Sequence, residues 1–408
     1  MDPAEMLALS AIGYRGCELN LSLPRNRKRV ADEISRCLTS FTPVQDKWTL
    51  LWGPAGYRPG IAGLDTSAMY VAGSKSSPST IAVLVRGTNF FSLQDWASNL
   101  MIAPRVWSYG SSGADARVSA SVWLGLKILQ TLKADPFSSL PPETELEMIQ
   151  ADVALVQARL EYAVLERILA GDMSYDAVGL IAGSMNQLPH LATAVPAAFP
   201  DEVALLSKMT QAQSVAPGAT TLFEFLKHFV SKASEQVNIH IVGHSKGGAL
   251  SPALALWLAD TQGNQAGPDG WDPGGGARLH VHTFAAPTPG NRAFANHFQQ
   301  KLNAGYRLAN PYDIVPHVWE PSEINQIPDL YGSQLHELKV PAHTLAELLQ
   351  PLDYQHECVA EPWPAGPLTA RPLPLQIAFN HLDAYLTRLG IFDAKTLSFL
   401  ALFAPLSR

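Results

Sequence analysis

The stretch that most constrains the fold of this chain is Val237-Asn-Ile-His-Ile-Val-Gly-His-Ser-Lys-Gly-Gly-Ala-Leu250. Strand-type residues up to Val242 run into a G-x-S-x-G sequence, and a helical run follows from Ala249 to Asp260. A strand, a sharp turn that carries serine and then a helix together form a nucleophile elbow. The serine in such a turn has a strained backbone, so its neighbours must lack a bulky Cβ. The stretch therefore predicts that Ser245 is a nucleophile.

A second informative segment is the unbroken apolar run from Ile81 to Val85, which is followed by Arg86-Gly-Thr88. Such a run is typical of a strand buried on both faces of a parallel sheet. At the carboxyl end of a buried strand, a short turn with a hydroxyl can present an N–H and an O–H to the crevice above the sheet. An ordinary strand-to-helix turn would give the same pattern, so this segment alone leaves both interpretations open.

Strands and helices alternate along the chain. Strands are expected at 48–52, 69–72, 81–85, 237–242, 280–284 and from 306, and helices at 28–40, 115–133, 144–170, 223–234, 249–260, 292–302 and from 379. This order predicts an α/β fold with a mostly parallel sheet covered by helices on both faces. Because the sequence contains no internal repeat or domain linker, we expect residues 1–408 to form a single domain.

Composition excludes several classes of function. Apolar residues make up 47% of the chain and charged residues 16%, which provides ample material for a large core. The net charge of −7 argues against a nucleic-acid partner. Three cysteines are too few for a disulfide framework, and no run of 18 apolar residues predicts a transmembrane helix. The amino-terminal sequence is not that of a signal peptide, so we expect a cytoplasmic protein or one exported without a recognisable leader.

Four motifs occur in an order that resembles the class 3 lipases, α/β-hydrolases related to the fungal triacylglycerol lipases. They are Val85-Arg-Gly-Thr88 with Asp95-Trp96 and Asn99, Ile241-Val-Gly-His-Ser-Lys-Gly-Gly-Ala-Leu250, Thr283-Phe284 to Pro287 with Gly290-Asn291, and Asn310-x-x-Asp313-x-Val315-Pro316. Together with the terminal histidine helix, the resemblance covers about residues 80 to 385. This chain has Lys246 where the family usually has leucine, and Pro252 lies inside the helix after the elbow, where it should remove a hydrogen bond or kink the helix.

The resemblance implies a catalytic triad in which Ser245 is the nucleophile, Asp313 the acid and His381 the base. The implied oxyanion donors are the backbone N–H of Thr88, with its hydroxyl as a further candidate, and the N–H of Lys246. It implies no cofactor and no metal. The rival base is His356, but His381 is favoured because it is expected at the start of the terminal helix.

The predicted function is that of a serine carboxylester hydrolase, a triacylglycerol lipase-like enzyme that forms an acyl-enzyme. Phospholipase A1 or short-chain esterase activity is the alternative within this class, and serine peptidases share the triad. A non-catalytic interaction module with a hydrolase fold is disfavoured because all three triad candidates are present. The expected partner is a lipid or ester substrate, and a lipid–water interface is one place where the enzyme would meet it.

Residues 136–217 form a long insertion between two helices that should flank the sheet. Its first half predicts an amphipathic helix, and its second half is richer in apolar residues than a solvated loop would be. Two interpretations remain open. The insertion could pack statically against the body of the protein, or it could be a cap that moves over an acyl-chain pocket.

Overall fold

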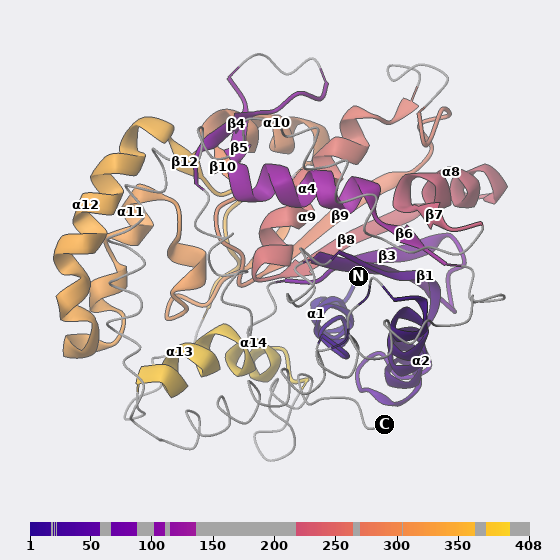
Figure 1. Cartoon of the computed structure of the whole chain (residues 1–408), viewed down its shortest axis with the longest axis horizontal. Coiled ribbons are helices and arrows are strands. Elements are labelled where there is room, and N and C mark those ends of the chain that lie inside the picture. The colour runs from indigo at the N-terminus through magenta and orange to yellow at the C-terminus, as the bar shows by residue number, and fades with distance from the viewer. Residues whose placement is uncertain are drawn as a thin grey trace.

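The computed structural model describes residues 1–17, 19, 21, 23–57, 67–87, 102–110, 115–135, 218–263, 270–303, 305–363 and 373–391. At the centre lies a six-stranded sheet in the order β1-β2-β3-β8-β9-β11 (Figure 1). Its strands are β1 (Trp48–Tyr57), β2 (Ser67–Ser74), β3 (Thr80–Val85), β8 (Asn238–His244), β9 (Arg278–Phe284) and β11 (Tyr306–Leu308). The last four are parallel, whereas β1, β2 and β3 pair in antiparallel fashion. The predicted α/β class is therefore confirmed, and the parallel part of the sheet carries an antiparallel edge.

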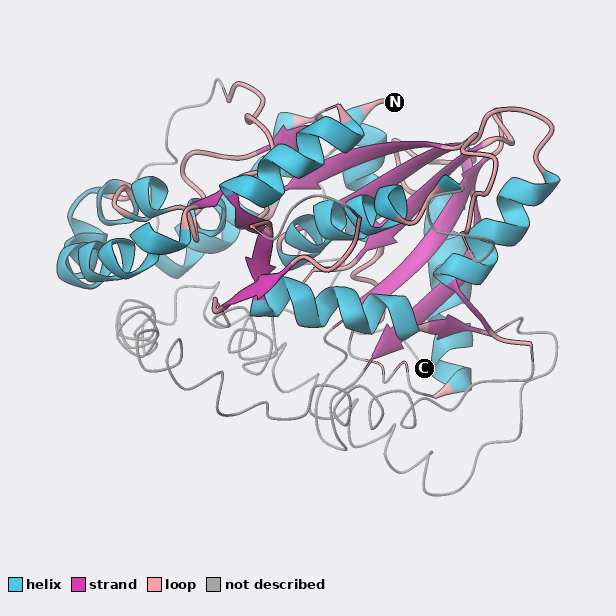
Figure 2. Cartoon of the chain, turned by 90° about the horizontal axis from the view of Figure 1, so that it is seen from above, coloured by secondary structure: helices cyan, strands magenta, loops and turns pink. Residues whose placement is uncertain are grey.

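Each face of the sheet is covered by its own apolar cluster, because side chains alternate along a strand. On β3, Ile81 and Val83 belong to one cluster, whereas Ala82 and Leu84 belong to the other. The first face is covered by α4 (Ala120–Thr131), α8 (Leu222–Lys232), α9 (Lys246–Asp260) and α10 (Arg292–Leu302). The opposite face is covered by α1 (Pro3–Ile12), α2 (Pro24–Ser40) and α14 (Asp383–Arg388). Figure 2 shows the twisted strands fanned out between these helices.

Side-chain caps fix where several helices begin. The hydroxyl of Ser119 accepts a hydrogen bond from the N–H of Val122 at the start of α4, and Asn291 caps α10 in the same way. Thr221 and Glu224 form a capping box on α8. The prediction of a helix over 115–133 is wrong at its start. Residues Arg117–Ser119 form β5, which pairs with β4 (Pro104–Val106), and the helix begins only after the cap.

A helical segment between the Asp313 turn and His356 was not predicted. It consists of the 3₁₀ turn η2 (Val315–His317), α11 (Pro321–Ile324), η3 (Ile327–Asp329), η4 (Gly332–Leu338), α12 (Lys339–Leu349) and η5 (Gln350–Leu352). Its buried apolar residues form a third cluster. Tyr312 and Ile314, the two neighbours of Asp313, pack against that cluster, so the segment lies beside the turn that carries Asp313.

The remaining elements are short. They are β6 (Lys133–Ala134), β7 (Thr220–Thr221), β10 (Gly290–Asn291), β12 (Tyr354–Gln355) and α13 (Leu373–His381). The predicted insertion at 136–217, Thr88 and the segment with Asp95 and Asn99 lie outside the described residues. Among the residues that are described, no helix is both long enough and apolar enough to cross a bilayer.

Candidate active site

Ser245 lies in a strained turn between β8 and α9. Its φ of 59° and ψ of −131° place it in a region that residues other than glycine rarely adopt. The close approach of neighbouring backbones explains the flanking glycines. A Cβ on Gly243 would lie 2.1 Å from the carbonyl oxygen of Gly247, and a Cβ on Gly247 would lie 2.2 Å from that of Val85. The backbone thus has the elbow geometry expected from the sequence, and α9 runs on through Pro252 without interruption.

The structure brings Ser245, His381 and Asp313 together. Oγ of Ser245 lies 3.0 Å from Nε2 of His381, and Nδ1 of His381 lies 2.9 Å from Oδ2 of Asp313. All three side chains are buried, with Asp313 only 1% exposed. A carboxylate can only accept a hydrogen bond, so Nδ1 carries the ring proton and Nε2 is the bare nitrogen that faces the serine hydroxyl. This is the tautomer that a general base for Ser245 needs.

Two further donors hold the carboxylate of Asp313. The backbone N–H of Val315 donates to Oδ1 at 3.0 Å, and the hydroxyl of Tyr385 donates to Oδ2 at 2.9 Å. Tyr385 in turn accepts a hydrogen bond from the backbone N–H of Asn310 at 2.8 Å. Burial, and next the charge of Asp313, raise the pKa of Tyr385 well above its usual range. The phenol therefore remains a donor, and the carboxylate is fixed from both sides.

A second buried histidine, His244, supports the main chain of His381. Its Nε2 lies 2.9 Å from the carbonyl oxygen of His381, which can only accept, so Nε2 carries the proton. Its Nδ1 then accepts from the hydroxyl of Tyr14 at 2.9 Å. Burial, and next the proximity of His381, hold the pKa of His244 well below its usual range. His244 is thus a neutral neighbour of the candidate base, and no sequence signal pointed to Tyr14.

The structure places the two rival histidines differently. His381 contacts Ser245, whereas Nε2 of His356 lies 2.8 Å from the carbonyl oxygen of Pro316. The expected position of His381 at the start of the terminal helix is wrong. It is the last residue of α13, and α14 begins two residues later at Asp383. The break between the two helices directs the His381 side chain toward the carboxyl end of β8, where Ser245 lies.

The predicted oxyanion donors are only partly covered by the described residues, because Thr88 lies outside them. The preceding residue, Gly87, packs against the elbow, since a Cβ there would lie 3.1 Å from the Cβ of Ser245. The adjacent parallel strands bring this about, because Val85 on β3 pairs with Gly243 on β8. Lys246 is the first residue of α9 and is buried. Its N–H lies in the first turn of a helix, where the helix dipole favours negative charge.

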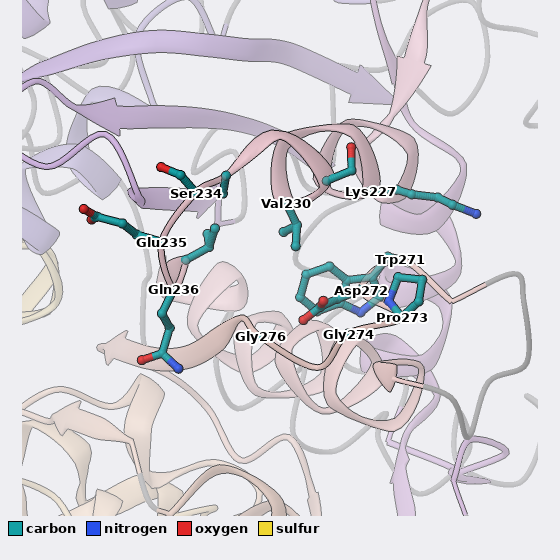
Figure 3. Close-up of a pocket in the computed structure, with 13 residues that line it drawn as sticks. Lys227, Val230, Ser234, Glu235, Gln236, Trp271, Asp272, Pro273, Gly274 and Gly276 are labelled. Atoms are coloured by element: carbon teal, nitrogen blue, oxygen red, sulfur yellow. The ribbon is translucent and has the colours of Figure 1, made fainter.

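A cavity of about 560 Å³ lies at the other end of β8 (Figure 3). It is lined by the end of α8 and by the segment that precedes β9, where Val230 and Trp271 face each other across it. Val237, just before β8, also lines it, whereas Ser245 follows the far end of this seven-residue strand. A strand of this length spans about 23 Å. The cavity is therefore separate from the Ser245 site.

Within the described ranges, no group of three or more His, Cys, Asp or Glu side chains is arranged to hold a metal ion. The sequence places two carboxylates, Asp269 and Asp272, in a Gly/Pro-rich stretch before β9, and Asp272 has a structural role there. Its Oδ2 accepts hydrogen bonds from the side chain of Gln262 and from the N–H of Ala277, each at 2.8 Å. These bonds close the loop, while Asp269 lies outside the described residues.

The sheet order, the strained serine at the end of β8 and the histidine and aspartate beside it are those of an α/β-hydrolase. The family model described as lipase (class 3) matches residues 202–322, the part that carries both Ser245 and Asp313. This match agrees with the resemblance to the class 3 lipases that the motifs predicted.

Among the solved structures that match, the M37 lipase supports the fold. The structure described as M37 lipase matches with a TM-score of 0.65 at 24% identity, over 96% of this chain and 93% of that one. The Rhizomucor miehei lipase propeptide complex matches with a TM-score of 0.36 at 14% identity, over 78% of this chain and 63% of that one. A triacylglycerol lipase from Penicillium expansum matches with a TM-score of 0.32 at 17% identity, over 78% and 75% of the two chains. A comparison with curated proteins found no match.

Proposed function

We propose that this chain hydrolyses lipid esters through an acyl-enzyme formed on Ser245. The observation that carries the proposal is the unbroken hydrogen-bonded chain from Oγ of Ser245 through the ring of His381 to the carboxylate of Asp313. A serine hydroxyl is a weak nucleophile unless a base removes its proton during attack. The bare Nε2 of His381 lies where it can do so. The same contact disfavours a non-catalytic role for this fold.

The reaction would proceed in two steps on these residues. Oγ of Ser245 attacks the ester carbonyl while Nε2 of His381 takes the hydroxyl proton, and the imidazolium then protonates the leaving alcohol. Asp313 holds the ring and stabilises the imidazolium. Water, activated by the same histidine, next hydrolyses the acyl-enzyme and frees Ser245. The oxyanion formed in each step would accept hydrogen bonds from the N–H of Lys246 and from Thr88.

Covalent labelling tests the proposed nucleophile. Incubation with a fluorophosphonate should label the protein once, and mass spectrometry of the digested product should locate the adduct on the peptide that contains Ser245. Prior heat denaturation should abolish labelling, because the activated hydroxyl exists only in the folded site. An adduct on another residue, or equal labelling of the denatured chain, would overturn the assignment.

The substrate class is tested separately. The match to the class 3 lipase model and the fold shared with the M37 lipase favour a lipid ester, and we take a triacylglycerol ahead of the phospholipase A1 and short-chain esterase alternatives. A chain-length series of p-nitrophenyl esters, measured beside an emulsified triacylglycerol and a phosphatidylcholine vesicle, separates the three. We expect the highest kcat/KM on long acyl chains and faster hydrolysis of the triacylglycerol. A maximum at acetate or butyrate, or faster cleavage of the phospholipid, would replace the proposed substrate.

The hydroxyl of Tyr385 should matter for turnover. Tyr385→Phe removes the donor to Oδ2 of Asp313, and a hydrogen bond to a charged group is worth enough to lower kcat by about tenfold. KM for a soluble ester should not change, because Tyr385 is fully buried beneath the carboxylate. Tyr109→Phe, which removes a half-buried hydroxyl bonded to Gln130, is the matched control. Equal kcat in the two variants would show that Tyr385 does not orient Asp313.

A further inference from the structure

His356 lies beside the turn that carries Asp313 and is 7% exposed. Its Nε2 lies 2.8 Å from the carbonyl oxygen of Pro316 and 3.3 Å from the hydroxyl of Thr288. A carbonyl can only accept, so Nε2 carries the ring proton and donates it to Pro316. Nδ1 therefore carries no proton, and the contact with the turn is made by Nε2.

The turn from Asp313 to Val318 is held at both ends. At its start, the N–H of Val315 binds the carboxylate of Asp313 itself. At its end, the N–H of Thr288 donates to the carbonyl of Val318 at 2.7 Å. The bond from His356 to Pro316 attaches the middle of the turn to the segment after β12. A shift of Pro316 would therefore be passed through Val315 to the Asp313 carboxylate.

The surroundings of His356 keep it neutral. Oε2 of Glu357 lies 3.9 Å from Nδ1 of His356, and neither atom has a hydrogen-bond partner within the described part of the chain. Burial raises the pKa of the Glu357 carboxyl, which favours its protonated form. Burial, and next the charge of Arg307, lower the pKa of His356 well below its usual range, and His317 acts in the same direction. His356 therefore does not change charge near neutral pH, and its bond to Pro316 persists.

We propose that His356 is a positioning residue, which holds the Asp313 turn through the Pro316 carbonyl so that the carboxylate meets Nδ1 of His381. This inference rests on the proposed roles of Ser245, His381 and Asp313. His356 touches neither the serine nor the base, so it acts only through the acid. In the sequence, His356 was the rival candidate for the catalytic base.

Loss of the hydrogen bond from His356 to Pro316 should change the kcat of each active site, whereas a loss of stability alone should not. Among the described residues, Asp313 and the neutral His244 face the ring of His381. If the turn relaxes, Asp313 moves away and the imidazolium loses part of its stabilisation. The kcat of each active site then falls. A variant that merely unfolds more easily would lose active sites but keep the kcat of those that remain.

The test compares three substitutions of His356, with kcat expressed per active site titrated by a fluorophosphonate. His356→Leu removes the donor and should lower kcat per active site about tenfold, with KM for a soluble ester unchanged. His356→Gln should stay within about threefold of the wild type, because its amide nitrogen can occupy the place of Nε2. His356→Asn, which is too short to reach Pro316, should resemble the leucine variant and replaces it if that variant does not fold.

Two failures can be told apart. If the wild-type protein is not labelled on Ser245, the proposed function fails and this inference falls with it. If the wild type is labelled, but the leucine and asparagine variants keep the kcat per site of the wild type, His356 has only a structural role. A kcat loss in the leucine, asparagine and glutamine variants alike would also overturn the proposal, because the donated hydrogen bond would not be what matters.

Discussion

Ser245→Ala and His381→Ala are each expected to lower kcat by about 10⁶-fold, with no further loss when the two are combined. The two groups act as a unit, because the serine hydroxyl is useful only while Nε2 of His381, 3.0 Å away, can accept its proton. Removing either one leaves the same residual activity from substrate binding and the oxyanion donors. The measurement is single-turnover and steady-state hydrolysis of a soluble p-nitrophenyl ester by the two single variants and the double variant.

His356→Ala is the matched control for that experiment. His356 is as deeply buried as His381, but it binds Pro316 rather than Ser245. Its loss should therefore cost about tenfold, several orders of magnitude less than the loss of His381. Additive losses in the double variant, or a larger loss from His356 than from His381, would mean that the base has been assigned wrongly.

Short sequence patterns were sufficient to predict the strand, the turn and the helix that position Ser245. The strand that becomes β8, the glycines around Ser245 and the start of α9 are all encoded within fourteen consecutive residues. Strand burial could be predicted in the same way, because the unbroken apolar run of β3 contributes side chains to both clusters. The family motifs then supplied the order of Asp313 and His381, which no periodicity could have provided.

Contacts between distant segments could not be predicted, because periodicity shows that a residue is buried but not which residue it meets. Tyr14 binds His244 across 230 positions of the sequence, and Tyr385 binds Asp313 across 72. The segment between Asp313 and His356 was missed for a different reason. Apart from α12, it is built of short helical turns, several of which have a proline near the first position, and these turns are too brief to show a clear period.

Mild acid should destabilise this protein strongly, because it buries a hydrogen-bonded pair of neutral histidines between the sheet and α1. Nδ1 of His240 on β8 lies 3.0 Å from Nε2 of His282 on β9, and His280 stacks on His240. Burial, and next the charge of neighbouring groups, lower the pKa of His240 and His282 to about 3. In the unfolded chain both groups titrate near pH 6.5.

The sign follows from which state binds the protons. Between pH 6.5 and about 3 the unfolded chain takes up protons that folded His240 and His282 refuse, so the free energy of unfolding falls as the pH falls through this window. Each histidine can contribute up to about 2 kcal/mol of this loss by pH 5. The other buried neutral histidines, His244 and His356, add to the loss in the same direction.

Urea unfolding at pH 7 and pH 5 measures the effect of the pair. The double variant His240→Leu/His282→Leu replaces both hydrogen-bonding partners with apolar side chains, so no buried donor is left without an acceptor. Its loss of unfolding free energy between the two pH values should be smaller than that of the wild type by up to about 4 kcal/mol. His343→Leu, which removes an imidazole whose side chain is 67% exposed on α12, should leave the wild-type loss unchanged. An unchanged loss in the double variant would mean that His240 and His282 can take up protons in the folded state, and that acid lability arises at His244 and His356 beside the proposed catalytic residues.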